Sequence, residues 1–101
     1  MNVIVTRHPG AVEWLRAKGI AGRIVEHLTP DDIGELRRGD AVYGVLPLPL
    51  ISLLLSRGVS FYLLALPEVP ADLRGVELSP ADMDRMGARM FMVRGLDLVP
   101  V

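Results

Sequence analysis

The sequence contains no cysteine, which excludes disulfide bonds and metal sites built from thiolates. Its two histidines, His8 and His27, are far apart along the chain, and no potential ligands show a recognised metal-ligand spacing. We therefore expect neither a metal nor another cofactor. A chain without cysteine is compatible with a reducing compartment, and we expect a cytoplasmic protein.

Strong charge of either sign and long hydrophobic runs are also missing. The 11 Lys and Arg residues against 12 Asp and Glu residues give a net charge of -1, so no broad field exists to hold a long nucleic acid. The most apolar run, VLPLPLISLLL, is interrupted by Pro47 and Pro49 and is shorter than the roughly 20 residues of a membrane span. The N-terminus lacks a signal-peptide pattern. We expect a soluble protein without a membrane partner.

Several enzyme motifs are absent as well. The sequence has neither G-x-G-x-x-G nor G-x-x-x-x-G-K-[ST], so no motif supports dinucleotide or P-loop nucleotide binding. A Ser-His-acid triad could use Ser52, Ser56, Ser60 or Ser79, but no G-x-S-x-G elbow frames any of them.

What is present predicts one α/β domain over residues 1–101, because half of the residues are hydrophobic and can fill one core. Apolar runs predict strands at about 2–6, 22–28, 41–46, 59–66 and 88–93. Helical patterns fill 9–19, 49–57 and 79–87, and a short helical turn follows Thr29. Thr29 and Ser79 are the expected N-caps, with Asp82 completing a capping box. This order is typical of a doubly wound, mostly parallel five-stranded sheet with helices on both faces.

The stretch VIVTRHPG places a cation and an imidazole where the first strand turns into a helix. In such sheets, ligands bind at the carboxyl ends of the strands, and the loops TRHPG and LPLPL are expected to meet there. Arg7 and His8 at a helix N-terminus make an anion site suited to a phosphate. Alternatively, Arg7 pairs with an acid such as Glu13 and His8 lies on the surface.

Other candidates have plainer interpretations. Trp14 either stacks on a base or is buried in the core. The polar residues of LRGVELSPADMDRMGARM either solvate or cap a helix, or approach a ligand. The sequence leaves open which arginine of the last third would approach that ligand: Arg74, Arg85, Arg89 or Arg94. The helix within residues 47–58 is apolar nearly all round, which predicts burial on both sides and a subunit interface.

Three blocks, VTRHPGAVEWL, GVLPLPL and LRGVELSPADM, together resemble a family of small CRISPR-associated proteins of type III systems, the Csx-type ancillary proteins. The resemblance covers nearly the whole chain. It implies a stand-alone CRISPR-associated Rossmann fold (CARF-like) and a ring nuclease, a dimeric and metal-independent enzyme that linearises cyclic oligoadenylate, chiefly cyclic tetra-adenylate.

With this resemblance, Arg7 and His8 are the expected catalytic residues. Arg7 would stabilise phosphoryl charge and His8 would move a proton. Pro49 stands where a polar residue is expected, so a sponge that binds the ring without cutting it is an alternative, as is an interaction module that docks through the 47–58 helix. The expected ligand-binding residues are Thr6, Pro9, Gly10, Trp14, Leu46, Pro47, Arg74, Glu77, Ser79 and Asp82.

Overall fold

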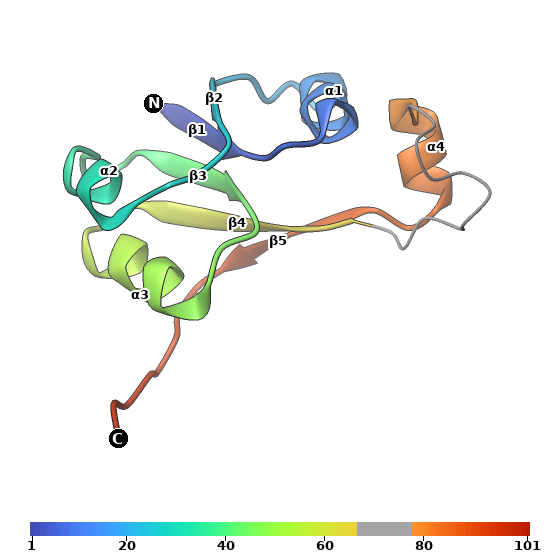
Figure 1. Cartoon of the computed structure of the whole chain (residues 1–101). Helices are drawn as coiled ribbons and strands as arrows, with labels where there is room; N and C mark the ends of the chain where they lie inside the picture. The colour runs from blue at the N-terminus through green and yellow to red at the C-terminus, as the bar shows by residue number, and fades with distance from the viewer. Residues whose placement is uncertain (67–77) are drawn as a thin grey trace.

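A five-stranded sheet forms the centre of the fold (Figure 1). The computed structural model describes residues 1–66 and 78–101. The strand order is β2-β1-β3-β4-β5, with β1 to β4 parallel and β5 antiparallel to β4. The predicted doubly wound, mostly parallel sheet is therefore confirmed. The strands are β1 (Asn2–Val5), β2 (Arg23–Val25), β3 (Ala41–Gly44), β4 (Ser60–Ala65) and β5 (Arg89–Val93).

Helices cover both faces of the sheet, as predicted. Helices α1 (Pro9–Ala17) and α4 (Pro80–Arg85) cover one face, and α2 (Pro30–Gly34) and α3 (Leu48–Ser56) cover the other. Side chains alternate along β1, so Val3 and Val5 contribute to the core beneath α2 and α3, whereas Ile4 joins the core beneath α1 and α4.

Within the described residues, the longest helices, α1 and α3, have only nine residues each, and no helix could cross a membrane.

Two predicted N-caps are confirmed. Thr29 and Ser79 each accept a hydrogen bond from the backbone N–H three residues later, at Asp32 and Asp82. The carboxylates of Asp32 and Asp82 accept the N–H groups of Thr29 and Ser79 in return, and these bonds lower the pKa of both carboxyl groups. The two capping boxes thus define the residues at which the short helices α2 and α4 begin.

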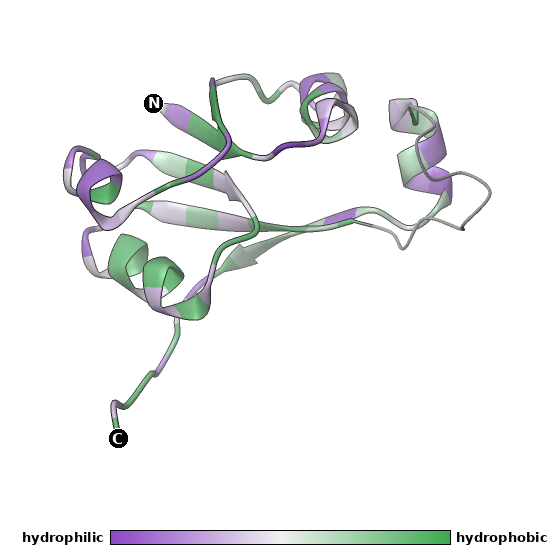
Figure 2. Cartoon of the chain, viewed as in Figure 1, coloured by the Kyte–Doolittle hydropathy of each residue, from purple (hydrophilic) through white to green (hydrophobic). Residues whose placement is uncertain are grey.

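Helix α3 has one buried side rather than the two that its sequence predicts. Ile51 and Leu54 pack in the core, but Leu48 and Leu53 are 54% and 37% exposed. Figure 2 shows α3 as a largely hydrophobic helix on the outside of the sheet. Nothing in the described residues covers the outer side of α3, so its predicted burial in a subunit interface stays a prediction.

A buried tryptophan joins α1 to α4. The Trp14 side chain is 1% exposed, and its indole N–H donates to Asp84 Oδ1 over 2.7 Å. The ammonium of Lys18 lies 3.6 Å from the same carboxylate oxygen and 4.6 Å from the centre of the Trp14 ring. The indole hydrogen bond is the main reason that the pKa of Asp84 is lowered, with Lys18 adding to it.

We expect acid to destabilise the fold partly through Asp84. Its pKa is lower in the folded chain, so the unfolded chain binds the proton first, near the ordinary value of 3.8. The stabilisation is therefore present above that pH and is lost as the pH falls through the lowered folded value. Urea unfolding between pH 7 and pH 3 should show Asp84→Asn to be less stable than the wild type at pH 7 and to lose less stability in acid.

Asp97→Asn is the matched control, because Asp97 is exposed after β5 and makes no hydrogen bond with the described residues. Parallel stability curves for the wild type and Asp84→Asn over this pH range would contradict the assignment.

Candidate functional site

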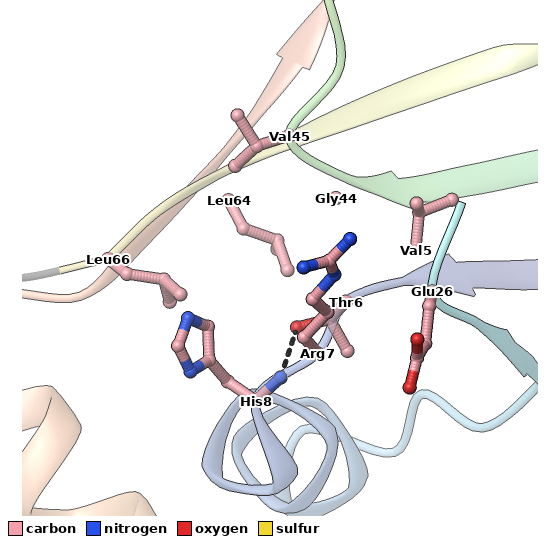
Figure 3. A pocket seen from close by; sticks show the side chains of 9 residues that line it. All are labelled: Val5, Thr6, Arg7, His8, Glu26, Gly44, Val45, Leu64 and Leu66. Carbon is pink, nitrogen blue, oxygen red and sulfur yellow. Dashed lines mark hydrogen bonds between the residues drawn. The ribbon is translucent and has the colours of Figure 1, made fainter. Parts of the chain in front are cut away.

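A pocket lies at the carboxyl ends of the central strands, where the sheet topology reverses. β1 has β2 on one side and β3 on the other, so the connections after β1 and β3 leave the sheet in opposite directions. This is the edge at which the sequence predicted a site. The pocket has a volume of about 280 Å³ and is lined by Val5, Thr6, Arg7, His8, Glu26, Gly44, Val45, Leu64 and Leu66 (Figure 3).

The corner after β1 is held by backbone and hydroxyl hydrogen bonds. The N–H of Thr6 continues the pairing of β1 with β2 by donating to the carbonyl of Val25, over 3.0 Å. The hydroxyl oxygen of Thr6 accepts the N–H of His8 over 3.1 Å, as the dashed line in Figure 3 shows. His8 is extended and precedes the first turn of α1, which begins with Pro9. Arg7 and His8 therefore project from a short, well-anchored corner.

Arg7 does not pair with Glu13, which was one prediction from the sequence. Glu13 instead accepts a hydrogen bond from Arg16 over 2.6 Å on the exposed side of α1. The Nη2 atom of Arg7 lies 2.7 Å from Nε2 of His27, a residue that follows β2. Arg7 and His8 are both exposed, and Figure 3 shows the guanidinium reaching toward Gly44 while the imidazole turns toward Leu66.

The floor of the pocket requires a glycine. A Cβ atom at position 44 would lie 2.5 Å from the carbonyl oxygen of Val5, closer than two such atoms can approach. Gly44 ends β3 beside the end of β1, so the two strands come close together beneath the corner. Apolar side chains of Val45, Leu64 and Leu66 complete the wall beyond it.

The pocket combines one permanent cation with two groups that can exchange protons. The Arg7 guanidinium provides donors for an anion, and His8 and Glu26 can carry protons. Helix α1 has no acidic residue in its first turn and no side-chain cap, so its positive end adds to the potential at the corner. This arrangement suits a ligand with a phosphate, and it can also support proton transfer.

Three of the residues predicted for the site line the pocket together, namely Thr6, Arg7 and His8. Pro9 and Gly10 form the first turn of α1 behind them. A Cβ added at Gly10 would lie 3.4 Å from the carbonyl oxygen of Leu78 and 3.6 Å from the sulfur of Met83 in α4. Gly10 therefore faces the start of α4, at ordinary contact distances.

The remaining predicted residues lie elsewhere. Trp14 is in the core, so its indole is not exposed for stacking on a base. Leu46 packs against the core beneath α2 and α3, and Pro47 precedes α3 as its N-cap residue. Ser79 and Asp82 form the capping box of α4. Arg74 and Glu77 lie outside the described residues.

Two residues near the corner were not predicted from the sequence. Glu26 lines the pocket and His27 binds Arg7, and both follow β2 directly. The strand had been predicted to extend to Leu28, but it ends at Val25, which leaves Glu26 and His27 in the connection. Their position directly after a predicted strand could have identified them. Neighbouring parallel strands bring the residues that follow their carboxyl ends to the same edge of the sheet.

The described residues contain no group of three or more histidine, cysteine, aspartate or glutamate side chains placed to hold a metal ion.

A family model described as "Putative CRISPR-associated protein (Cas_VVA1548)" matches residues 3–94. This match shows that the chain belongs to a CRISPR-associated family, the broader part of what the three sequence blocks predicted. No curated protein and no solved structure matches the chain.

We expect Gly44→Ala to destabilise the fold, because the added methyl group meets the Val5 carbonyl and must push β1 away from β3. Forced overpacking of this kind costs about 1–3 kcal/mol, which urea unfolding measures directly. The matched control is Gly95→Ala, where nothing lies within 4 Å of the added Cβ. Equal stability of the two variants would contradict the close approach beneath the pocket.

Proposed function

Because the chain belongs to the CRISPR-associated protein family whose model matches residues 3–94, we propose that it is a ring nuclease of type III CRISPR systems. It binds cyclic oligoadenylate, with cyclic tetra-adenylate as the preferred ring, and opens that ring. The observation that carries the proposal is the placement of Arg7 and His8 in one pocket at the carboxyl ends of β1 and β3.

In the proposed reaction, a ribose 2'-hydroxyl attacks the adjacent phosphorus atom. A new bond forms between the 2'-oxygen and phosphorus, and the bond between phosphorus and the 5'-oxygen of the next nucleotide breaks. The 2'-hydroxyl gives up its proton, and the departing 5'-oxygen receives one. The product is a linear oligoadenylate with a 2',3'-cyclic phosphate at one end and a 5'-hydroxyl at the other, and no external nucleophile is consumed.

The pocket contains groups for each requirement of this step. The guanidinium of Arg7 stabilises negative charge on the non-bridging oxygens of phosphorus. His8 is the proton carrier, because its imidazole has two ring nitrogens, of which one can accept a proton and the other can donate one. Glu26 is the other lining residue that can exchange a proton. The Thr6 hydroxyl accepts from the N–H of His8 and still has its own hydrogen to donate to a phosphate oxygen.

The size of the pocket favours a site shared between two chains. A volume of about 280 Å³ lies below the range of roughly 300–1,000 Å³ that encloses small ligands, and a ring of four nucleotides is larger than most of them. A ring of four identical nucleotides has two-fold symmetry, so a two-fold dimer can present the same corner to its opposite halves. We therefore propose a homodimer in which each chain supplies half of the site.

The surface proposed for the second copy begins at the pocket. Val45 lines the pocket and is 63% exposed, and Leu48, three residues later, is 54% exposed at the start of α3. Phe91 pairs with Leu63 in the antiparallel register, which places its side chain on the α3 side of the sheet, and it is 50% exposed. Because Val45 belongs both to the pocket and to these exposed apolar residues, a second copy bound to them would lie beside the ligand.

The decisive experiment incubates the purified protein with cyclic tetra-adenylate in EDTA and analyses the nucleotide by mass spectrometry. We expect linear products that carry a cyclic phosphate. Arg7→Ala and His8→Ala should each lower the turnover about 100-fold or more, the usual loss when a charge-stabilising or proton-transferring group is removed. Both residues are exposed, so unfolding by urea should change little.

Arg16→Ala is the matched control, because Arg16 is an exposed arginine of α1 that does not line the pocket. Unchanged turnover in both Arg7→Ala and His8→Ala would remove their proposed roles. Intact ring that stays bound to the protein would identify a sponge, and a ring that does not bind would reject the proposed ligand.

The proposed dimer predicts a distinct effect of Leu48→Asp. A carboxylate in an apolar interface must lose its hydration, so this variant should be monomeric by light scattering and should lose ring cleavage while remaining folded. Leu98→Asp is the control, since Leu98 is an exposed leucine in the segment after β5. A wild-type mass equal to one chain at micromolar concentration would overturn the dimer, and a dimer without any response to the ring would favour an interaction module.

A further inference from the structure

We propose that His27 is a positioning residue that holds the guanidinium of Arg7 in place for the phosphate. This inference rests on the proposed function, in which Arg7 stabilises the phosphoryl oxygens. It is drawn from the 2.7 Å contact between Arg7 Nη2 and His27 Nε2, which joins the corner after β1 to the connection after β2.

The chemistry of the two side chains fixes the direction of this hydrogen bond. A guanidinium has five N–H donors and no acceptor, so Arg7 donates and Nε2 of His27 accepts. His27 is therefore neutral in this arrangement and carries its ring hydrogen on Nδ1. The bond uses one of the five N–H groups of Arg7, and the others are left to face a phosphate.

The acceptor is well anchored although its ring is exposed. Two residues before His27, the carbonyl of Val25 is bound by the N–H of Thr6, and the next residue, Leu28, is 8% exposed in the core. The Thr29 cap of α2 follows directly. His27 is thus held between two fixed points, whereas Arg7 is a long, exposed side chain that would otherwise sample many rotamers.

The contact between Arg7 and His27 joins residues that line two different pockets. Arg7 lines the pocket described above, and His27 lines a neighbouring pocket of about 310 Å³ on the α2 side of β2. Protonation of His27 would leave two cations facing each other and abolish its acceptor, so the hydrogen bond requires a neutral ring. The charged groups at or beside this second pocket are the amino group of Met1 and the side chains of Arg23, Glu26, Asp32 and Glu35.

The effect of the bond should fall on catalysis more than on binding. An unrestrained Arg7 remains charged and still attracts the ring, but it meets the developing charge on the phosphoryl oxygens less often in the right orientation. Loss of one net hydrogen bond corresponds to a decrease of roughly 2- to 10-fold. We expect that decrease in kcat, with a much smaller change in KM.

The first test compares His27→Leu with His27→Gln in cleavage of cyclic tetra-adenylate. Leucine offers no acceptor and should show the loss in kcat, whereas the glutamine carbonyl can accept from Arg7 and should restore most of it. Equal kcat values in the wild type and His27→Leu would overturn the proposal.

A second measurement does not depend on cleavage. Nitrogen–proton NMR of the free protein reports which ring nitrogen of His27 carries the hydrogen. We expect the Nδ1–H form in the wild type and a mixture of both forms in Arg7→Ala, with Arg16→Ala unchanged. An identical spectrum of His27 in the wild type and Arg7→Ala would overturn the contact itself. If the wild type shows the Nδ1–H form but does not cleave the ring, the proposed function is rejected, but the hydrogen bond between Arg7 and His27 is still supported.

Discussion

The parallel pairing of β1 between β2 and β3 is the constraint on which the site depends. It brings three chain segments that are distant in sequence to one edge of the sheet, and it sets their spacing through backbone hydrogen bonds. On one side, Thr6 extends the pairing to Val25. On the other, Gly44 allows β3 to approach Val5 more closely than any larger residue would. The corner with Arg7 and His8 stands on this framework.

The two faces of the sheet are stabilised in different ways. Beneath α2 and α3 the core consists of aliphatic side chains with Phe61, and its contacts are nonspecific hydrophobic packing. On the other face, the short helix α4 is docked against α1 through the indole of Trp14 and the carboxylate of Asp84. That directional bond defines how α4 is oriented against α1.

The side chain of Arg7 is contacted by His27, which lies outside the pocket that Arg7 lines. An exposed arginine has many rotamers, and a phosphate gains little from a guanidinium that is seldom in position. In this chain, the imidazole of His27 from the neighbouring connection contacts the arginine, while His8 lines the pocket. The open apolar surface from Val45 to Leu48 adjoins this arrangement, which places the proposed dimer contact and the proposed ligand at the same edge.

The sequence by itself determined the elements, their order and the N-caps at Thr29 and Ser79, because periodicity, capping residues and turn residues are local signals. Through the three blocks, it also indicated that the chain is CRISPR-associated. It also located the corner with Arg7 and His8. Only the tertiary structure decided that β2 ends before Glu26, that His27 rather than Glu13 meets Arg7, and that Trp14 bonds to Asp84. These contacts join residues 20 and 70 positions apart, and such pairings depend on which strands and helices become neighbours, a choice that no local pattern encodes.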